Sequence, residues 1–155
     1  VFQLIGDGMQ KKYLLSESKK HNLKNVIFRE SVPKNEVFKY ILASDVGVSM
    51  LKKTKTFKTI YSNKTFDYMS CKRPVLMAID GVSRKLIEEA KCGFFVEPEN
   101  IDSIVSGLIR FSTLETKLLE SMGHNGYIYA KEFFDRKKLA SKYIIELESI
   151  FNEKK

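Results

Sequence analysis

Short apolar runs alternate with amphipathic stretches through residues 1–97, and this alternation is the strongest constraint on the fold. The runs are rich in Val, Ile, Phe and Leu and nearly continuous in apolar character, as expected for strands covered on both faces. Alternating strands and helices predict an α/β fold with a Rossmann-like, doubly wound parallel sheet and helices on both faces. We expect strands at residues 1–5, 25–29, 46–51, 75–79 and 93–97, and helices at 9–21, 34–43, 63–71 and 83–92.

After residue 97 the pattern is helical only, which predicts a helical C-terminal section. Asn100 or Glu99 can cap a helix that starts near residue 101, and further helices are expected at 114–133 and from Asp135 onward. The last helix is long and amphipathic, so we expect part of it to pack on something outside this sequence. Its expected apolar face comprises Leu139, Tyr143, Ile144, Leu147, Ile150 and Phe151.

The composition is that of one globular domain, predicted to span residues 1–155. Hydrophobic residues make up 43% and charged residues 30% of the sequence, which is ordinary for a globular chain. No apolar run approaches the roughly 20 residues that cross a bilayer. Because the sequence opens on a strand-like run without an initiator Met or a charged leader, we expect a fragment of a longer protein.

Cysteine and histidine usage gives no indication of a metal site. Cys71 and Cys92 lack Cys-x-x-Cys spacing, so we expect free thiols in a reducing, cytoplasmic compartment. His21 and His124 are far apart and have no metal-ligand spacing around them. The sequence therefore predicts neither a bound metal nor a cofactor.

The formal net charge of +8 is densest in a lysine-rich stretch between residues 51 and 64, which contains no acid. Such a run is either a solvated loop or an electrostatic funnel beside a phosphate site or a membrane surface. A nucleic-acid-binding loop that uses Phe57 and Tyr61 is an alternative, but no nucleic-acid fold signature accompanies it, and nucleic acid is not the expected partner. The lysines are Lys52, Lys53, Lys55, Lys58 and Lys64.

Lys64 and Asp67 form the most informative pair in the chain. They lie three residues apart on one face of the helix expected at 63–71, which leads into the apolar strand at 75–79. A cation and the N–H groups of a helix start favour phosphate oxygens, while a carboxylate accepts hydrogen bonds from vicinal hydroxyls. The pair therefore fits a ligand that is part phosphate and part ribose. The alternative is a surface ion pair of a few tenths of a kcal/mol.

Glycines at two predicted strand ends offer further candidate contacts. Gly6 and Gly8 follow the first strand and open a helix, which is typical of a nucleotide-binding turn, although Lys11 replaces the third glycine of that pattern. A plain tight turn explains the same residues. Gly81 and Ser83 follow the strand at 75–79, and ligands of open α/β sheets bind at such carboxyl ends.

Taken in order, these segments resemble the C-terminal, donor-binding domain of the group 1 (family 4) retaining glycosyltransferases, which have the two-domain GT-B fold. The resemblance spans essentially the whole chain and rests on several motifs together. The motifs are Leu4–Gly8 (LIGDG), Asn25–Phe28 (NVIF), Val32–Glu36 (VPKNE), Ala43–Val48 (ASDVGV), Asn63–Val75 (NKTFDYMSCKRPV) and Glu88–Gly93 (EEAKCG).

The resemblance implies half of a GT-B architecture that binds a nucleotide-diphosphate sugar as substrate, without a metal, for retaining transfer to an acceptor. In that family a pair of acids lies at this helix, and Asp67 matches the second, which binds the ribose hydroxyls. The first acid, which contacts the donor sugar, would fall at Thr59, so this chain departs from the pattern there. Lys64 lies where the family cradles the diphosphate, and the resemblance assigns catalytic roles to Lys64 and Asp67.

The remaining binding residues implied by the resemblance lie on two segments. The backbone from Asn63 through Thr65 to Phe66 would cradle the diphosphate. The base would rest against the end of the second strand, at Phe28, Arg29 and Glu30. Glu30 is also the loose match to a ribose-binding acid of dinucleotide-binding folds.

The implied partners are the nucleotide-sugar donor and a missing N-terminal acceptor domain of the same protein. The basic surface adds an anionic membrane or a lipid-linked acceptor, with a location in the cytoplasm or at the inner membrane face and a role in cell-surface polysaccharide synthesis. Three alternatives stay open: a GT-B-type nucleotide-sugar epimerase domain, the basic nucleic-acid module, and a degenerate domain that only pairs with a catalytic partner.

Overall fold

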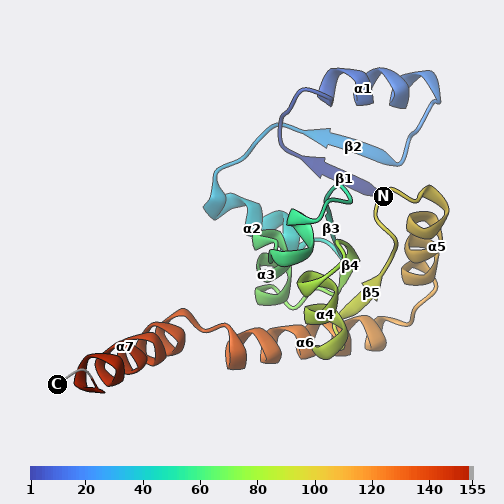
Figure 1. Cartoon of the computed structure of the whole chain (residues 1–155). Helices are drawn as coiled ribbons and strands as arrows, with labels where there is room; N and C mark the ends of the chain where they lie inside the picture. The colour runs from blue at the N-terminus through green and yellow to red at the C-terminus, as the bar shows by residue number, and fades with distance from the viewer. Residues whose placement is uncertain (154–155) are drawn as a thin grey trace. The chain divides into compact units, whose positions relative to one another are not determined.

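The structure, a computed structural model, describes residues 1–153 as two compact units, Val1–Tyr40 and the chain from Ile41 onward (Figure 1). In the first unit, strand β1 (Phe2–Ile5) pairs in parallel with β2 (Val26–Arg29), and α1 (Lys11–Lys20) makes the crossover. The register joins Phe2 to Val26 and Ile5 to Arg29. Helix α2 (Lys34–Leu42) follows and leads into the second unit.

The second unit contains a parallel sheet in the order β3-β4-β5, formed by β3 (Gly47–Met50), β4 (Val75–Ala78) and β5 (Gly93–Phe95). A 3₁₀ helix, η1 (Thr56–Thr59), and α3 (Asn63–Ser70) connect β3 to β4, and α4 (Val82–Glu89) connects β4 to β5. Three helices complete the chain: α5 (Ile101–Ser112), α6 (Thr116–Phe133) and α7 (Arg136–Glu153).

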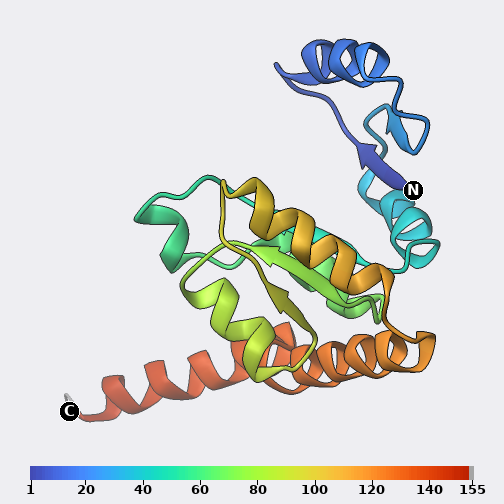
Figure 2. The same ribbon diagram turned by 90° about the vertical axis from the view of Figure 1, so that its right-hand side faces the viewer.

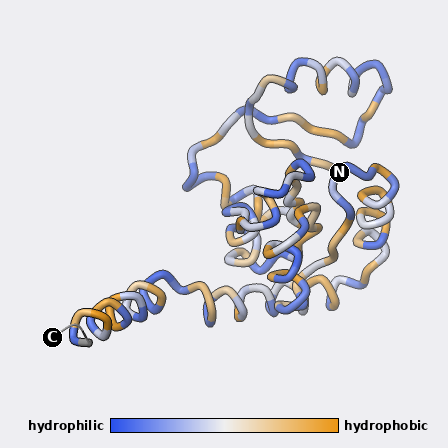
Figure 3. Tube along the Cα trace, viewed as in Figure 1, coloured by the Kyte–Doolittle hydropathy of each residue, from blue (hydrophilic) through white to orange (hydrophobic). Residues whose placement is uncertain are grey.

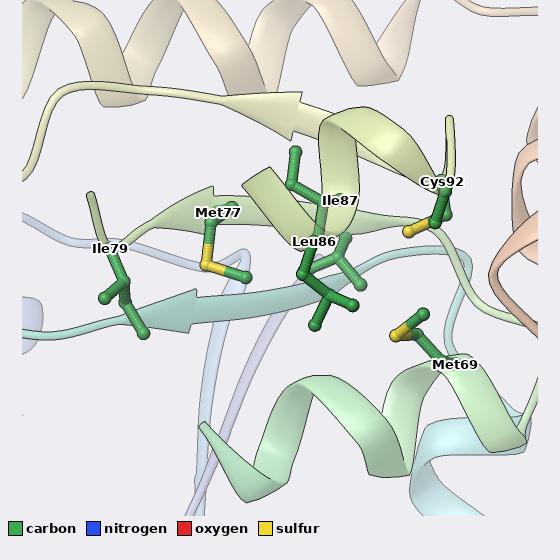
Figure 4. Packing of buried hydrophobic residues seen from close by; sticks show 8 residues of the cluster. Met69, Met77, Ile79, Leu86, Ile87 and Cys92 are labelled. Atoms are coloured by element: carbon green, nitrogen blue, oxygen red, sulfur yellow. The ribbon is translucent and has the colours of Figure 1, made fainter. Parts of the chain in front are cut away.

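The sheet of the second unit is covered on both faces, because β4 is buried on both sides. Met77 and Ile79 point to one face, where they meet Met69 of α3 and Leu86 and Ile87 of α4 (Figure 4). Leu76 and Ala78 point to the opposite face and pack with residues of α5 and α6, among them Phe111 and Met122. Figure 2 shows α5 and α4 on opposite sides of this sheet. The alternation along β4 thus builds the predicted three-layer α/β arrangement.

The sequence located the five strands and all seven α-helices, with most boundaries one or two residues too long. It missed η1, which lies in the lysine-rich stretch. The hydrogen-bonded strands form two parallel sheets, β1-β2 and β3-β4-β5, where the sequence predicted one sheet, because each set pairs within its own unit. The strand expected at 93–97 ends at Phe95, although the Val96 N–H still donates to the Met77 carbonyl at 2.9 Å.

Helix α7 has the amphipathic pattern that its sequence predicts, with polar and apolar residues on different sides (Figure 3). Asp135 caps its start, since its carboxylate accepts from the N–H groups of Lys137 and Lys138 at 2.9 and 3.0 Å. The apolar side is exposed: Leu139 is 46% and Tyr143 66% accessible. What covers this face stays a prediction from the sequence. Among residues 1–153, no helix combines the length and the apolarity needed to cross a membrane.

Candidate functional site

Helix α3 begins directly after Ser62, which is its N-cap residue and has an extended backbone (φ −76°, ψ 124°). The carbonyl of Ser62 accepts from the N–H of Thr65 at 3.0 Å. The N–H groups of Asn63 and Lys64 donate to no backbone carbonyl within the described part of the chain. Because a helix start leaves its first N–H groups without intrahelical acceptors, this end of α3 is suited to an anion.

Lys64 and Asp67 both lie on the outward side of α3, as the sequence predicts for a pair that meets a ligand. The Lys64 side chain is exposed and Asp67 is partly exposed, whereas Thr65 and Met69 between and beyond them are fully buried. The helical period therefore gives α3 a core side and a solvent side, with the cation and the carboxylate one turn apart on the latter.

Thr65 and Phe66 hold α3 in place through their side chains. The Thr65 hydroxyl is buried and donates to Oγ of Ser49 on β3 at 3.2 Å. The Phe66 ring packs on Tyr61 and Phe134, with ring centroids 5.9 and 4.9 Å away. The Thr65 hydroxyl is thus bonded within the protein, and the Phe66 ring is partly buried. Contact through their backbone, as the family resemblance implies, remains a prediction.

Gly81 and Ser83 pack against the loop between β3 and α3 (residues 51–62), and this packing explains why a glycine and a serine occupy these two positions. Gly81 has φ +84°, and a Cβ at this position would lie 2.0 Å from the Lys58 carbonyl oxygen. A side chain would therefore meet both a strained backbone and a backbone atom that cannot move aside. The Ser83 hydroxyl is buried and donates to the Ile60 carbonyl at 2.8 Å. If the Ser83 hydroxyl donated to a bound ligand, it would have to give up this hydrogen bond to the Ile60 carbonyl.

Charged pairs neutralise part of the lysine-rich stretch. Lys58 Nζ lies 2.6 Å from Asp80 Oδ2, and this hydrogen bond, together with the Gly81 N–H, lowers the pKa of the Asp80 carboxyl. A bond to the carboxylate of Glu97 raises the pKa of Lys53, whose N–H also donates to Glu99 at 2.9 Å. Three exposed lysines form no ion pair with any carboxylate of residues 1–153. These are Lys52, Lys55 and Lys64.

In the first unit, the turn after β1 lines an open hollow, as a nucleotide-binding turn would. The Asp7 carboxylate accepts from the N–H of Gly8 at 2.8 Å, and the Gly8 carbonyl accepts from the N–H of Lys11 at 3.1 Å. Gly6 has φ +140° and Gly8 has φ +159°. The residues around the hollow are Asp7, Gly8, Met9, Lys11, Lys12, Leu15 and Glu30.

The three residues expected to contact a base lie at the end of β2 and differ in their surroundings. Glu30 pairs with Lys11 at 2.7 Å, with the lysine side chain 15% and the glutamate side chain 85% exposed. Arg29 donates to the Gln3 side chain at 2.8 Å and covers the Tyr40 ring at 5.4 Å. Phe28 is half-buried. The structure brings Gly8 and Glu30 to one hollow, with a lysine between them that the sequence did not select.

A family model described as Glycosyl transferases group 1 matches residues 1–129. The chain belongs to this family. No curated protein matches the sequence.

Three solved structures illustrate the fold of this group 1 domain. Sucrose-phosphate synthase from Thermosynechococcus elongatus is 16% identical with a TM-score of 0.79, and the match covers 97% of this chain and 38% of that one. Anabaena HepE in complex with UDP-glucose is 22% identical with a TM-score of 0.76, covering 95% and 40%. A mutant of TarM from S. aureus, in complex with fondaparinux, alpha-GlcNAc-glycerol and UDP, is 19% identical with a TM-score of 0.77, covering 92% and 28%.

These likenesses confirm the predicted α/β fold as that of the GT-B glycosyltransferases. The group 1 domain described here spans 38% of the synthase chain and 40% of HepE, so it corresponds to less than half of either. Within residues 1–153, no cluster of three or more His, Cys, Asp or Glu side chains could hold a metal ion.

Sequence reasoning missed the ion pair of Asp80 and Lys58, which joins the loop before α3 to the residues that follow β4. A usable signal for Asp80 was present, because an acid directly after a buried strand lies at the carboxyl end of the sheet, where ligands and loops meet. Lys58 had no such signal, since it is one lysine among five in an uninterrupted basic stretch.

Proposed function

We propose that this chain is the donor-binding domain of a retaining glycosyltransferase that uses a nucleotide-diphosphate sugar. The observation that carries the proposal is the start of α3, where exposed Lys64 and partly exposed Asp67 lie one turn apart beside backbone N–H groups without carbonyl partners. Membership of the group 1 family supports it, as do two similar structures, which are complexes with UDP-glucose and with UDP.

In this proposal Asp67 accepts hydrogen bonds from two ribose hydroxyls and so fixes the donor's orientation. Lys64 and the N–H groups of Asn63 and Lys64 face the diphosphate. As the sugar leaves, negative charge builds up on the diphosphate, and donors that are already in position stabilise it without reorganisation. Losing one such donor lowers turnover on the order of 100-fold.

The first unit is proposed to take other parts of the donor. The end of β2, at Phe28, Arg29 and Glu30, is proposed to contact the base, and the turn at Gly6 and Gly8 to approach a phosphate. Its hollow and the flexible backbone of the glycines support this assignment.

The proposal also covers the partner domain, the acceptor and the location of the whole protein. We infer a single donor domain over residues 1–155 that works with an acceptor domain elsewhere in the protein, in cell-surface polysaccharide synthesis. A cytoplasmic location, peripheral at the inner membrane face, and a lipid-linked acceptor agree with the net charge of +8. Because acceptor contacts and part of the diphosphate site would belong to that other domain, we expect this chain to bind a donor without turning it over.

Calorimetry with uridine and guanosine diphosphates tests the donor site on this chain. We expect one of the two to bind, and Asp67→Asn and Lys64→Gln each to weaken it roughly 10- to 100-fold, because each removes a charge-assisted hydrogen bond. Asp102→Asn and Lys117→Gln are matched controls, since both residues are exposed on helices other than α3, and their affinity should equal that of the wild type. No binding of either nucleotide, or equal effects in the controls, would remove the donor-site assignment.

A further inference from the structure

The loop between β3 and α3, residues 51–62, is attached at several points to the strand ends that follow β4 and β5; we name it the β3–α3 loop. Near its start, the Leu51 N–H donates to the Ala78 carbonyl at 3.3 Å, and the Lys53 N–H donates to Glu99 at 2.9 Å. Near its end, the loop is held by three residues that follow β4: Asp80, Gly81 and Ser83. Nine of the twelve residues of this loop are exposed, and contacts of its backbone and of two lysine side chains hold it.

The attachment near the end of the loop consists of Asp80, Gly81 and Ser83, which we call the latch. Asp80 binds Lys58 at 2.6 Å, Gly81 lies against the Lys58 backbone, and the Ser83 hydroxyl donates to Ile60 at 2.8 Å. Ser83 is fully buried, so breaking this bond leaves its hydroxyl without water as a substitute. The latch therefore fixes the loop at Lys58 and Ile60, five and three residues before Asn63, where α3 starts.

We propose that Asp80, Gly81 and Ser83 are positioning residues, which fix the start of α3 for the donor's diphosphate by holding the β3–α3 loop; this rests on the proposed function. On its inner side α3 is held by the bond between Thr65 and Ser49. On its N-terminal side, α3 is held indirectly, because the latch holds the loop that leads into it. Hydrogen-bond donors stabilise an anion most when they are already in place, so a loose loop weakens binding at Asn63 and Lys64 although no ligand-contacting atom has changed.

The sign of the effect at Asp80 separates positioning from simple electrostatics. Asp80→Asn removes a negative charge, so electrostatics alone makes binding of an anion equal or tighter. Loss of the latch makes the same binding weaker. Asp80 and Lys58 are both partly exposed, with side chains 28% and 49% accessible, so their substitution leaves the core intact.

The test combines hydrogen–deuterium exchange of the β3–α3 loop with calorimetric affinity for the nucleoside diphosphate that the wild-type chain binds. The variants are Asp80→Asn, Ser83→Ala and Lys58→Gln, with Lys58→Arg as the conservative variant and Lys85→Gln, an exposed lysine of α4, as the control. We expect exchange in residues 51–62 to accelerate about tenfold in the first three and affinity to fall about three- to tenfold. Lys58→Arg should restore both values, and Lys85→Gln should change neither.

Three results would contradict the proposal or part of it. Unchanged loop exchange in Asp80→Asn and Ser83→Ala would show that the latch does not hold the loop. Faster exchange with unchanged or tighter binding in Asp80→Asn would overturn the positioning role. If the wild-type chain bound neither uridine nor guanosine diphosphate, the proposed function would fail and the donor part of this inference with it, while the exchange data would still decide whether the latch holds the loop.

Discussion

At the scale of single residues, burial decides which polar or reactive side chains are available for chemistry. Thr65 and Ser83 carry hydroxyls that suit phosphate binding, yet both are fully buried and bonded within the protein. Lys64, which directly precedes the buried Thr65, remains exposed. The helical period therefore separates candidate ligand contacts from structural contacts more sharply than residue type does.

The two cysteines give a test of burial at this scale. Cys92 is fully buried, and burial raises the pKa of its thiol to about 12; burial also raises the pKa of the partly exposed Cys71. Since the thiolate is the nucleophile, we expect iodoacetamide at pH 8 to label Cys71 slowly and Cys92 only after unfolding in urea. Peptide mass spectrometry with and without urea measures this, and equal labelling of both thiols in the folded protein would contradict the burial of Cys92.

At the scale of elements, close packing of α6 explains glycines that its sequence pattern does not. Gly123 is buried, and a Cβ there would lie 2.0 Å from the carbonyl oxygen of Lys72, in the turn after α3. Lys72 itself has φ +54°, in the left-handed region. The approach of α6 to this turn thus fixes the C-terminal end of the same helix that presents Lys64 and Asp67 at its start.

We predict that Gly123→Ala destabilises the protein by about 1–3 kcal/mol. Alanine favours a helix over glycine by about 1 kcal/mol, but a clash with a backbone carbonyl requires α6 to shift, and this cost is larger. Urea unfolding followed by circular dichroism measures the change. The control is Ser121→Ala, an exposed position on the same helix, which should stay within about 0.5 kcal/mol of the wild type. A Gly123→Ala protein as stable as this control would refute the close approach.

The comparison of sequence with structure follows the same division between local and distant contacts. Strands such as β4 were predictable because their apolar character is written in consecutive residues. Helix η1 was not, since residues 56–59 have no apolar period and the loop is held by Asp80 and Ser83, which are more than twenty residues away in sequence. Lys64 and Asp67 could be placed on one side of a helix from their spacing alone, and their contact with a ligand stays a prediction.

The contacts of Gly81 and Ser83 could not be predicted from the sequence. Their place after a buried strand correctly indicates the carboxyl end of the sheet. The sequence cannot tell whether a residue there meets a ligand or a neighbouring loop, because both arrangements require small residues and exposed hydrogen-bonding groups. The contacts of Gly81 with Lys58 and of Ser83 with Ile60 show the neighbouring loop, while a ligand contact of these two residues stays a prediction.

At the scale of the whole molecule, the hydrophobic core is confined to the second unit. Every buried apolar residue in the described part of the chain lies between Met69 and Met122, and none of residues 1–40 is buried. The first unit consists of a two-stranded sheet, its crossover helix and most of α2, and Phe2 and Leu4 on its first strand are each 42% exposed. A sheet of two strands is marginally stable in water, since it buries little apolar surface.

We therefore predict that residues 41–155 fold without the first unit, whereas residues 1–40 do not fold as a separate peptide. Circular dichroism and amide proton spectra should show cooperative urea unfolding for residues 41–155 and narrow, disordered-type dispersion for residues 1–40. Ile87→Ala provides a control for the origin of the stability. Because Ile87 is fully buried in the core of the second unit, its truncation should lower the free energy of unfolding by about 2–5 kcal/mol. The loss should be the same in residues 41–155 as in the full chain. A smaller cost in the shorter chain, or a folded spectrum for residues 1–40, would mean that stability is shared between the units.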